Sequence, residues 1–213
     1  MSQTSIEWTD RSWNPTKGCS KVSHGCTNCY AMTMAYRLGA MGNRHYQGLT
    51  EKRKGRLVWT GKISIDVDVI DQPLKWKKPA RVFVNSMSDL FHEDIPCSIL
   101  DQIWRVMEQA KQHNFQILTK RPERMLALLS QTDLFPVLSN VWLGVSVEDS
   151  DTIQKLDFLR QVPASVRFVS LEPLIGPTPR LNLTNIDWAI VGGESGPRSR
   201  AIEQVWVQEI FEE

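Results

Sequence analysis

Three of the four cysteines of this chain lie within one short loop. Cys19, Cys26 and Cys29 follow one another with the spacing C-x6-C-x2-C, and glycines around them allow the backbone to turn tightly. Three thiolates on one loop favour a soft metal centre. Iron–sulfur clusters are usually held by four cysteines, so three on a four-iron cluster leave one iron open for a substrate or cofactor. We call residues 18–30 the cysteine loop.

Two other interpretations of the cysteine loop stay open. A structural zinc site takes four ligands, and His24 would supply the fourth from within the loop. In the other interpretation the cysteines are unrelated and one or two of them are simply buried. The remaining cysteine, Cys97, lies far downstream and is interpreted as an ordinary residue at the start of a helix.

The composition excludes few functions. The chain has 213 residues and a formal net charge of +1, which is enough for a substantial core, and we interpret residues 1–213 as a single domain. The balanced charge gives no strong overall attraction to nucleic acid or to a membrane. No segment has the apolar pattern of a signal peptide or a bilayer span, so we expect a soluble, cytoplasmic protein. A reducing cytosol keeps clustered thiols available for metal.

Short apolar stretches alternate with amphipathic ones along most of the chain. A first strand is expected within residues 6–13, before the cysteine loop, and later strands at 81–84, 115–118, 141–145, 166–169 and 186–191. Helices are expected at residues 28–38, 97–112, 123–129, 151–159 and 203–211. The alternation predicts an α/β fold with about six parallel βα units, as in an incomplete parallel (β/α)6 TIM-like barrel. An open doubly wound sheet is the alternative.

Residues 44–79 are the least regular part of the chain and are interpreted as an insertion into this domain. They contain two basic runs, at residues 51–56 and 75–78. One interpretation of these runs is a solvated surface. The other is a contact with the phosphate groups of a nucleotide or polynucleotide.

Polar residues follow every predicted strand. In a parallel barrel all of these loops open at the same face, and the cysteine loop opens there too. A helix N-cap is the ordinary explanation for one such residue taken alone, but it explains charged residues directly at a strand end less well. The candidate site residues at these positions are Asn85, Ser86, Asp89, Lys120, Arg121, Ser146, Glu148, Glu172 and Glu194.

Several longer stretches carry a family resemblance over nearly the whole chain. They are IEWTDRSWNP at residues 6–15, GCTNCYA at 25–31, FVNSMSDLF at 83–91, LTKRP at 118–122, WLGVSVE at 142–148, SLEPL at 170–174 and VGGESG at 191–196. Together they resemble a phage-associated family of three-cysteine proteins of uncharacterised function. That family is in turn similar to divergent radical S-adenosylmethionine (SAM) enzymes.

The resemblance implies a set of cofactors and partners. A 4Fe-4S cluster would be held by Cys19, Cys26 and Cys29, and SAM would bind its open iron. An electron donor such as flavodoxin or ferredoxin would reduce the cluster, and the substrate is expected to be a nucleic acid or nucleotide. The residues expected to bind SAM are Tyr30, Asn85, Ser86, Asp89, Lys120, Ser146, Glu148 and Glu172.

The chain departs from the common radical-SAM pattern in its cysteine spacing. The usual motif is C-x3-C-x2-C with an aromatic residue before the third cysteine, whereas here the first gap is longer and that residue is Asn28. Tyr30, just after the third cysteine, would take the place of the aromatic residue. Gly192, Gly193 and Glu194 follow the last predicted strand, not the second, so the family role of such a stretch does not transfer. A zinc-stabilised binding protein and a cluster protein without turnover therefore remain alternatives.

Overall fold

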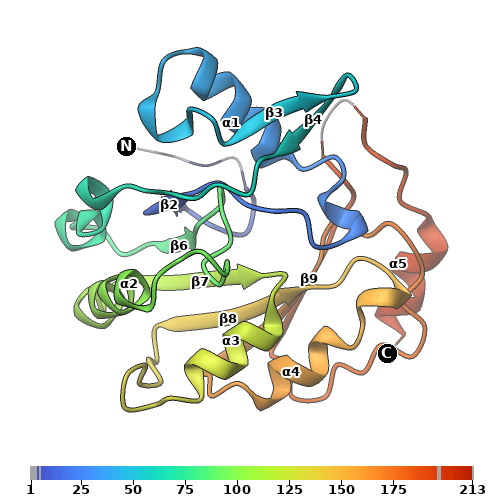
Figure 1. Ribbon diagram of the computed structural model, residues 1–213. Coiled ribbons are helices and arrows are strands. Elements are labelled where there is room, and N and C mark those ends of the chain that lie inside the picture. Colours follow the sequence, from blue (N-terminus) through green and yellow to red (C-terminus); the bar gives the residue numbers. More distant parts are fainter. Residues whose placement is uncertain (1–3, 5, 196–197, 213) are drawn as a thin grey trace.

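A six-stranded parallel sheet forms the centre of the protein, described here from a computed structural model that covers residues 4, 6–195 and 198–212 (Figure 1). Its strands, in spatial order, are β1 (Arg11–Trp13), β6 (Arg81–Val84), β7 (Asn114–Thr119), β8 (Val141–Ser146), β9 (Val166–Leu171) and β10 (Trp188–Val191). Every neighbouring pair is parallel, and the spatial order is the chain order. A doubly wound sheet requires a reversal of strand order, so that alternative is wrong.

Helices α2 (Cys97–Gln109), α3 (Pro122–Leu129) and α4 (Lys155–Gln161) lie along one side of this sheet (Figure 1). The sequence explains their packing, since the apolar residues of α2 recur at helical spacing on one buried face. Alternate strand residues meet the helices and form the main core with them. The strand residues on this face include Val82, Val84, Ile117, Leu143, Val145 and Val169. The remaining two helices are α1 (Tyr30–Ala40), directly after the cysteine loop, and α5 (Gln204–Phe211).

The opposite face of the sheet is aromatic and curved. Phe83 of β6 and Trp188 of β10 lie on this face, and the ring of Trp8 contacts both, at centroid distances of 4.7 and 6.1 Å. Four strand spacings separate β6 from β10, which would be about 19 Å in a flat sheet. One indole can reach both rings only because the sheet bends around this face. No pairing between β1 and β10 closes a barrel in the described part of the chain.

Gly144 in the middle of β8 is explained by the same aromatic face. The ring of Phe168, on the neighbouring strand, covers the Gly144 backbone, and a Cβ atom there would lie 2.5 Å from a ring carbon. A glycine inside a strand marks such a close approach.

The segment between α1 and β6 is tied to the cysteine loop on both sides. It contains η2 (Arg44–Tyr46), β3 (Thr50–Arg53), β4 (Arg56–Trp59), β5 (Ser64–Ile65), η3 (Val67–Val69) and η4 (Gln72–Lys75). β5 pairs with β2 (Thr16–Lys17), just before the cysteine loop, and Lys17 bonds the buried Asp66 at 2.5 Å. The β3–β4 hairpin packs against α1, just after that loop.

Most expected elements are present, with two differences of extent. The first strand is shorter than expected because residues 6–9 form a turn, with the Thr9 amide donating to the Ile6 carbonyl at 3.3 Å. The helix expected at 151–159 is divided into η5 (Ser150–Thr152) and α4, since Asp149 and Thr152 form a capping box that begins a separate turn.

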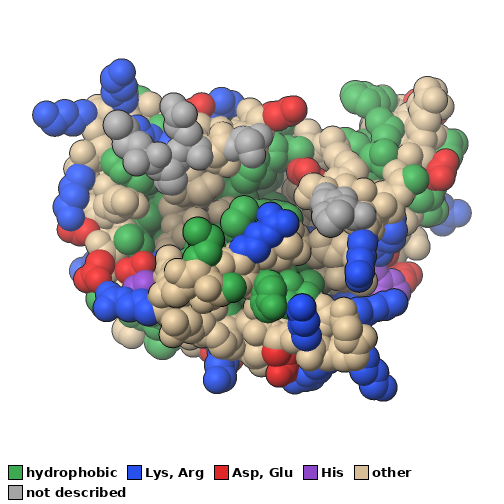
Figure 2. Space-filling view, turned by 90° about the horizontal axis from the view of Figure 1, so that it is seen from above, with side chains coloured by type: hydrophobic (Ala, Val, Ile, Leu, Met, Phe, Trp, Pro, Cys, Tyr) green, Lys and Arg blue, Asp and Glu red, His purple; other side chains and the backbone are tan. Residues whose placement is uncertain are grey.

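The surface carries charges of both signs. Figure 2 shows lysine and arginine side chains projecting around one face of the molecule, with acidic side chains among them. Among the described residues, no helix is both long and apolar enough to cross a bilayer.

Candidate functional site

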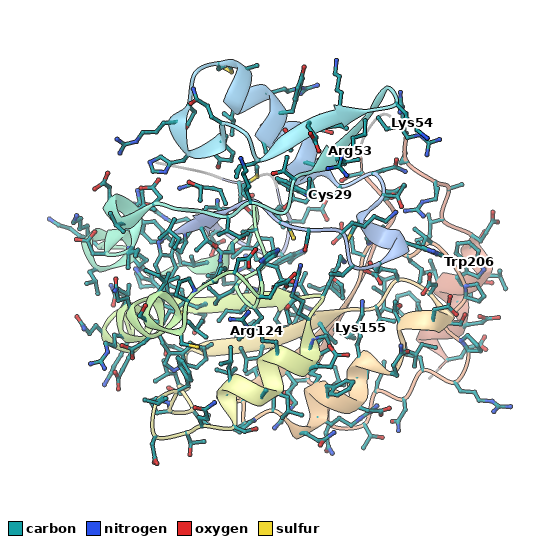
Figure 3. All side chains as sticks on the ribbon, in the orientation of Figure 1. Cys29, Arg53, Lys54, Arg124, Lys155 and Trp206 are labelled. Atoms are coloured by element: carbon teal, nitrogen blue, oxygen red, sulfur yellow. The ribbon has the colours of Figure 1, made fainter. Side chains whose placement is uncertain are left out.

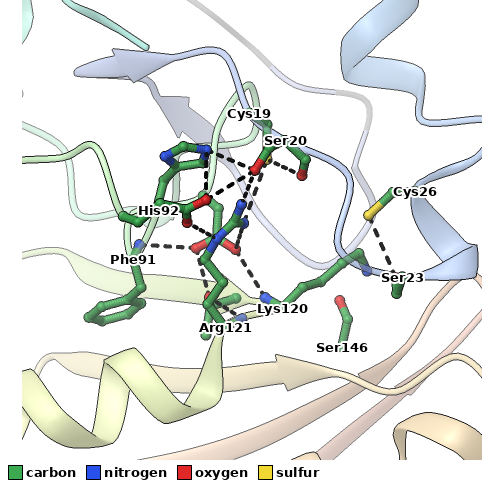
Figure 4. A network of polar contacts seen from close by, with 12 residues as sticks. Cys19, Ser20, Ser23, Cys26, Phe91, His92, Lys120, Arg121 and Ser146 are labelled. Atoms are coloured by element: carbon green, nitrogen blue, oxygen red, sulfur yellow. Dashed lines mark hydrogen bonds and ion pairs between the residues drawn. The ribbon is translucent and has the colours of Figure 1, made fainter. Parts of the chain in front are cut away.

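The cysteine loop lies at the carboxyl edge of the parallel sheet, as expected from its position after a strand (Figure 4). Its first residue, Gly18, has a φ of +93°, and a Cβ atom there would lie 2.2 Å from the Lys62 carbonyl oxygen. The Gly18 amide donates to the Met87 carbonyl at 3.0 Å, which joins the loop to the segment after β6. Only glycine fits this start of the loop.

The three thiols of the loop are half-buried and close to cations. Cys19 Sγ lies 3.8 Å from Nη1 of Arg121, and Cys26 Sγ lies 3.6 Å from Ser23 Oγ. Burial raises the pKa of Cys19 to about 12, against the opposing effect of Arg121, and burial also raises the pKa of Cys29. The loop therefore holds protonated thiols at neutral pH, and a bound metal would displace their protons.

The described residues do not form a closed metal site. Among them, no group of three or more His, Cys, Asp or Glu side chains is already arranged to hold an ion. The His24 side chain, the fourth ligand of the zinc interpretation, is exposed. Cys97 is exposed at the first residue of α2, as expected for a helix start. The donor set of three sulfurs with cations beside them fits an iron–sulfur cluster in its chemistry.

Arg121 fastens the first part of the cysteine loop to the end of β7 (Figure 4). It pairs with Asp89 at 3.1 Å and with Glu93 at 2.8 Å, and it donates to Ser20 Oγ at 2.6 Å. Asp89 also accepts from Thr119 Oγ1 at 2.7 Å and from the Lys120 amide at 3.1 Å. The Asp89 carboxylate is thus occupied by donors of the protein itself.

Glu148 fastens the second part of the loop. Its side chain is fully buried and pairs with Lys120 at 2.7 Å and with Lys155 at 3.1 Å. Burial alone would raise the pKa of Glu148, but the two ammonium groups outweigh it and hold that pKa below its ordinary value. Ser23 Oγ donates to the same carboxylate at 2.9 Å, and a Cβ atom on Gly25 would lie 2.6 Å from Glu148 Cγ. The loop therefore rests directly on Glu148.

Asn85, Ser86 and Tyr30 join the end of β6 to the start of α1. Asn85 Nδ2 donates to Thr16 Oγ1 at 2.9 Å, and the Tyr30 hydroxyl donates to the Ser86 carbonyl at 2.8 Å. Burial raises the pKa of Tyr30, so its hydroxyl stays protonated. The ring is nevertheless 45 % exposed and so is accessible to a ligand.

Free polar groups remain beside these networks. Ser146 and Ser170 are neighbours in the β8–β9 register, both buried, and Ser170 Oγ has no partner in the described part of the chain. Glu172 follows directly after β9, and its pKa is raised by burial, although a hydrogen bond from Trp8 opposes this. Gly192 packs against the Glu172 carboxyl group, since a Cβ there would lie 3.2 Å away.

The loop after β10 holds the far end of the cysteine loop. Asn28 Nδ2 donates to Glu194 at 2.9 Å, and Arg200 bonds the same carboxylate and also the His24 carbonyl, the latter at 3.1 Å. Sequence reasoning identified Glu194 but missed Asn28 and Arg200 as its partners, together with Ser23 and Lys155 at Glu148. A surface depression at residues 180–184 shares no lining residue with this site.

Ser20 and His92 are in contact but do not form a nucleophile–base pair. His92 is buried, and its Nδ1 accepts from the Asp94 amide at 3.2 Å. Nε2 therefore carries the ring proton and donates to Ser20 Oγ at 3.0 Å. A base for Ser20 would have to accept its proton, so a serine-nucleophile mechanism does not fit.

The stability of this region should depend on pH through His92. Burial, assisted by Arg121, holds the pKa of His92 below its ordinary value of about 6.5. The unfolded chain takes up this proton first, so the stabilisation is complete above about pH 6.5 and decreases as the pH falls towards the folded-state pKa. We expect urea unfolding to give a lower free energy at pH 5.5 than at pH 7.5, and His92→Gln to reduce the difference. An unchanged difference in His92→Gln would contradict the assignment, while His113→Gln serves as a control for the other buried histidine whose pKa is lowered by burial.

These features define an α/β protein with a six-stranded parallel sheet and a three-cysteine loop fastened across its carboxyl edge. The chain belongs to the family described as DUF5131, a protein of unknown function, which it matches over residues 3–213. This description names no activity and gives no link to phage or to radical SAM enzymes. No curated protein matches the chain, and no solved structure matches it.

Proposed function

We propose that the cysteine loop holds a 4Fe-4S cluster through Cys19, Cys26 and Cys29, and that the protein is a radical SAM-like enzyme. The observation that carries this proposal is the position of the loop at the carboxyl edge of the parallel sheet, beside Lys120 and Arg121. Parallel α/β proteins bind their ligands at this edge. The two cations suit the negative charge of a cluster held by thiolates.

The shape of the sheet supports the same proposal. We infer that the open sheet is an incomplete (β/α)6 barrel of the radical SAM type. Its strands follow the chain order, as in a barrel, and Trp8 spans its aromatic face from β6 to β10.

The residues would divide between holding the loop and binding SAM. Lys120, Asp89, Asn85 and Glu148 are already paired within the protein and would keep the loop in position. The groups left for SAM are Tyr30, Ser86, Ser146, Ser170 and Glu172. Glu172 is suited to accept hydrogen bonds from ribose hydroxyls or from the amino group. The buried aromatic face behind it would exclude water.

When bound, the cluster and SAM would together supply a 5′-deoxyadenosyl radical that removes a hydrogen atom from the substrate, with the electron coming from a donor such as flavodoxin or ferredoxin. The substrate is proposed to be a nucleic acid or nucleotide, because two basic runs lie in the segment packed against the cysteine loop.

Metal content tests the proposal directly. Protein purified without oxygen should be brown and contain about four irons and a similar amount of labile sulfide per chain. Cys26→Ala should lose this iron, whereas Cys97→Ala, the matched control outside the loop, should retain it.

Two outcomes would overturn the proposal. One is full iron retention by Cys26→Ala. The other is a colourless protein with one zinc after attempted cluster reconstitution, which would favour the zinc-stabilised binding protein, and loss of that zinc in His24→Ala would identify the fourth ligand. A loaded protein that fails to cleave SAM would be a cluster protein without turnover.

A further inference from the structure

The β3–β4 hairpin presents cations in a way that its own fold does not require. Its two turn residues, Lys54 and Gly55, both have positive φ, at 47° and 76°. Such two-residue turns ordinarily take Asn, Asp or Gly at both positions, because other residues are strained there. Lys54 therefore occupies the tip at some cost in stability and places an ammonium group at the end of the hairpin.

The strands beside the tip add further cations. Arg53 and Arg56 lie directly opposite each other in the hairpin register, and like charges in this position are destabilising. Among the described residues, the only acidic partner of the four exposed cations is Glu51, which bonds Arg53 at 2.6 Å. The four cations are Lys52, Arg53, Lys54 and Arg56. An excess of unpaired charge at a strained tip favours an external anion as its partner.

The hairpin is mounted on the helix that begins at the cysteine loop. Trp59 of β4 packs against a small core that includes Ala31 and Ala35 of α1. Figure 3 shows Arg53 and Lys54 on the hairpin above the side of the sheet on which Cys29 lies. A molecule held by the hairpin is therefore held next to the candidate site.

The neighbouring surface of α1 is aromatic as well as basic. The Lys52 ammonium lies 5.4 Å from the centroid of the Tyr36 ring, and Tyr36 and Met34 remain 40 % and 43 % exposed. Cations that follow a backbone, next to exposed rings on which bases can stack, are the two components of single-strand binding.

We propose that the β3–β4 hairpin and the adjacent face of α1 bind the phosphodiester backbone of a nucleic acid strand. This inference rests on the proposed function in one respect, since it identifies a polynucleotide as the substrate presented to the cysteine loop. The binding itself requires no cluster.

The test is fluorescence anisotropy with labelled 20-nucleotide single-stranded DNA, single-stranded RNA and duplex DNA. The variant R53Q/K54Q/R56Q removes three charges from the hairpin. The variant K75Q/K77Q/K78Q removes the same three charges from the second basic run and is the matched control. The mutated hairpin side chains are exposed, so both variants should fold, which circular dichroism would verify.

We expect the hairpin variant to bind at least tenfold more weakly and to show a salt dependence shallower by roughly two, as about 0.7 per lost phosphate contact predicts for a single strand. The control variant should bind within about twofold of the unmutated protein. Equal losses in the two variants, or no binding by the unmutated protein at low salt, would overturn the inference. Repeating the measurement with Cys26→Ala separates the two proposals: unchanged binding with lost iron supports the hairpin whatever the metal does.

The three probes identify the form of the strand. Stronger binding of either single strand than of the duplex is expected, because stacking on Tyr36 needs an unpaired base. A preference for the duplex would contradict the role of the α1 face.

Discussion

Replacing Glu148 with alanine is expected to lower the free energy of unfolding by about 3–5 kcal/mol, because the change leaves two neighbouring ammonium groups without their shared partner. Glu148 is fully buried, and the side chains of Lys120 and Lys155 are only 21 % and 10 % exposed. Ser23 would lose its acceptor at the same time, so the cysteine loop would lose its support.

Urea unfolding of Glu148→Ala measures this effect, and Asp101→Ala is its control. Asp101 pairs with Arg105 at 2.9 Å on the exposed side of α2, where an ion pair contributes less than about 1 kcal/mol. A loss in Glu148→Ala no larger than that in Asp101→Ala would contradict the assigned role. Glu148→Gln, which keeps the shape but removes the charge, should lie between the two.

Replacing Trp13 with alanine is expected to cost about 3–5 kcal/mol, since it removes a large, fully buried side chain from the main core. The ring lies 5.7 Å from that of Phe115, and its Nε1 donates to the Val69 carbonyl at 2.8 Å. Trp13 is also the last residue of β1, so its loss should loosen the strand that leads into the cysteine loop.

The control for Trp13 is Trp206 on α5, which is only partly buried and should cost clearly less when changed to alanine (Figure 3). Thermal unfolding of both variants makes the comparison. Trp13→Phe should recover most of the loss, because it keeps the apolar ring and gives up only the hydrogen bond to Val69. Equal losses in Trp13→Ala and Trp206→Ala would show that β1 is not anchored in this way.

Much of the fold could be predicted from the sequence, because each strand of the sheet is a short apolar run with a helix pattern after it. The curvature of the sheet could not. Trp8, Trp142 and Trp188 are far apart in the chain, and nothing in their spacing indicates that Trp8 contacts the rings of both Phe83 and Trp188. The tryptophans were interpreted only as general packing residues.

The candidate site was predicted in outline but not in its internal pairing. The polar residues do follow the parallel strands, yet Asp89, expected to bind a cofactor, is occupied by Arg121. Ser23 and Glu148 are 125 positions apart, and Asn28 and Glu194 are 166 apart, so local patterns carry no signal of these bonds. The best available signal was the pair Lys120 and Arg121 directly after a strand.

The sequential order of the strands has a consequence for how the protein is made. The cysteine loop leaves the ribosome first, and the groups that hold it follow in the order of the sheet: Asp89 and Arg121, then Glu148, then Glu194 and Arg200. At about 5–20 residues per second, the 166 positions between Asn28 and Glu194 take roughly ten to thirty seconds to translate. During that interval the three thiols belong to a nascent chain and are open to cellular maturation factors. The last strand to be synthesised is therefore the one that ends their accessibility.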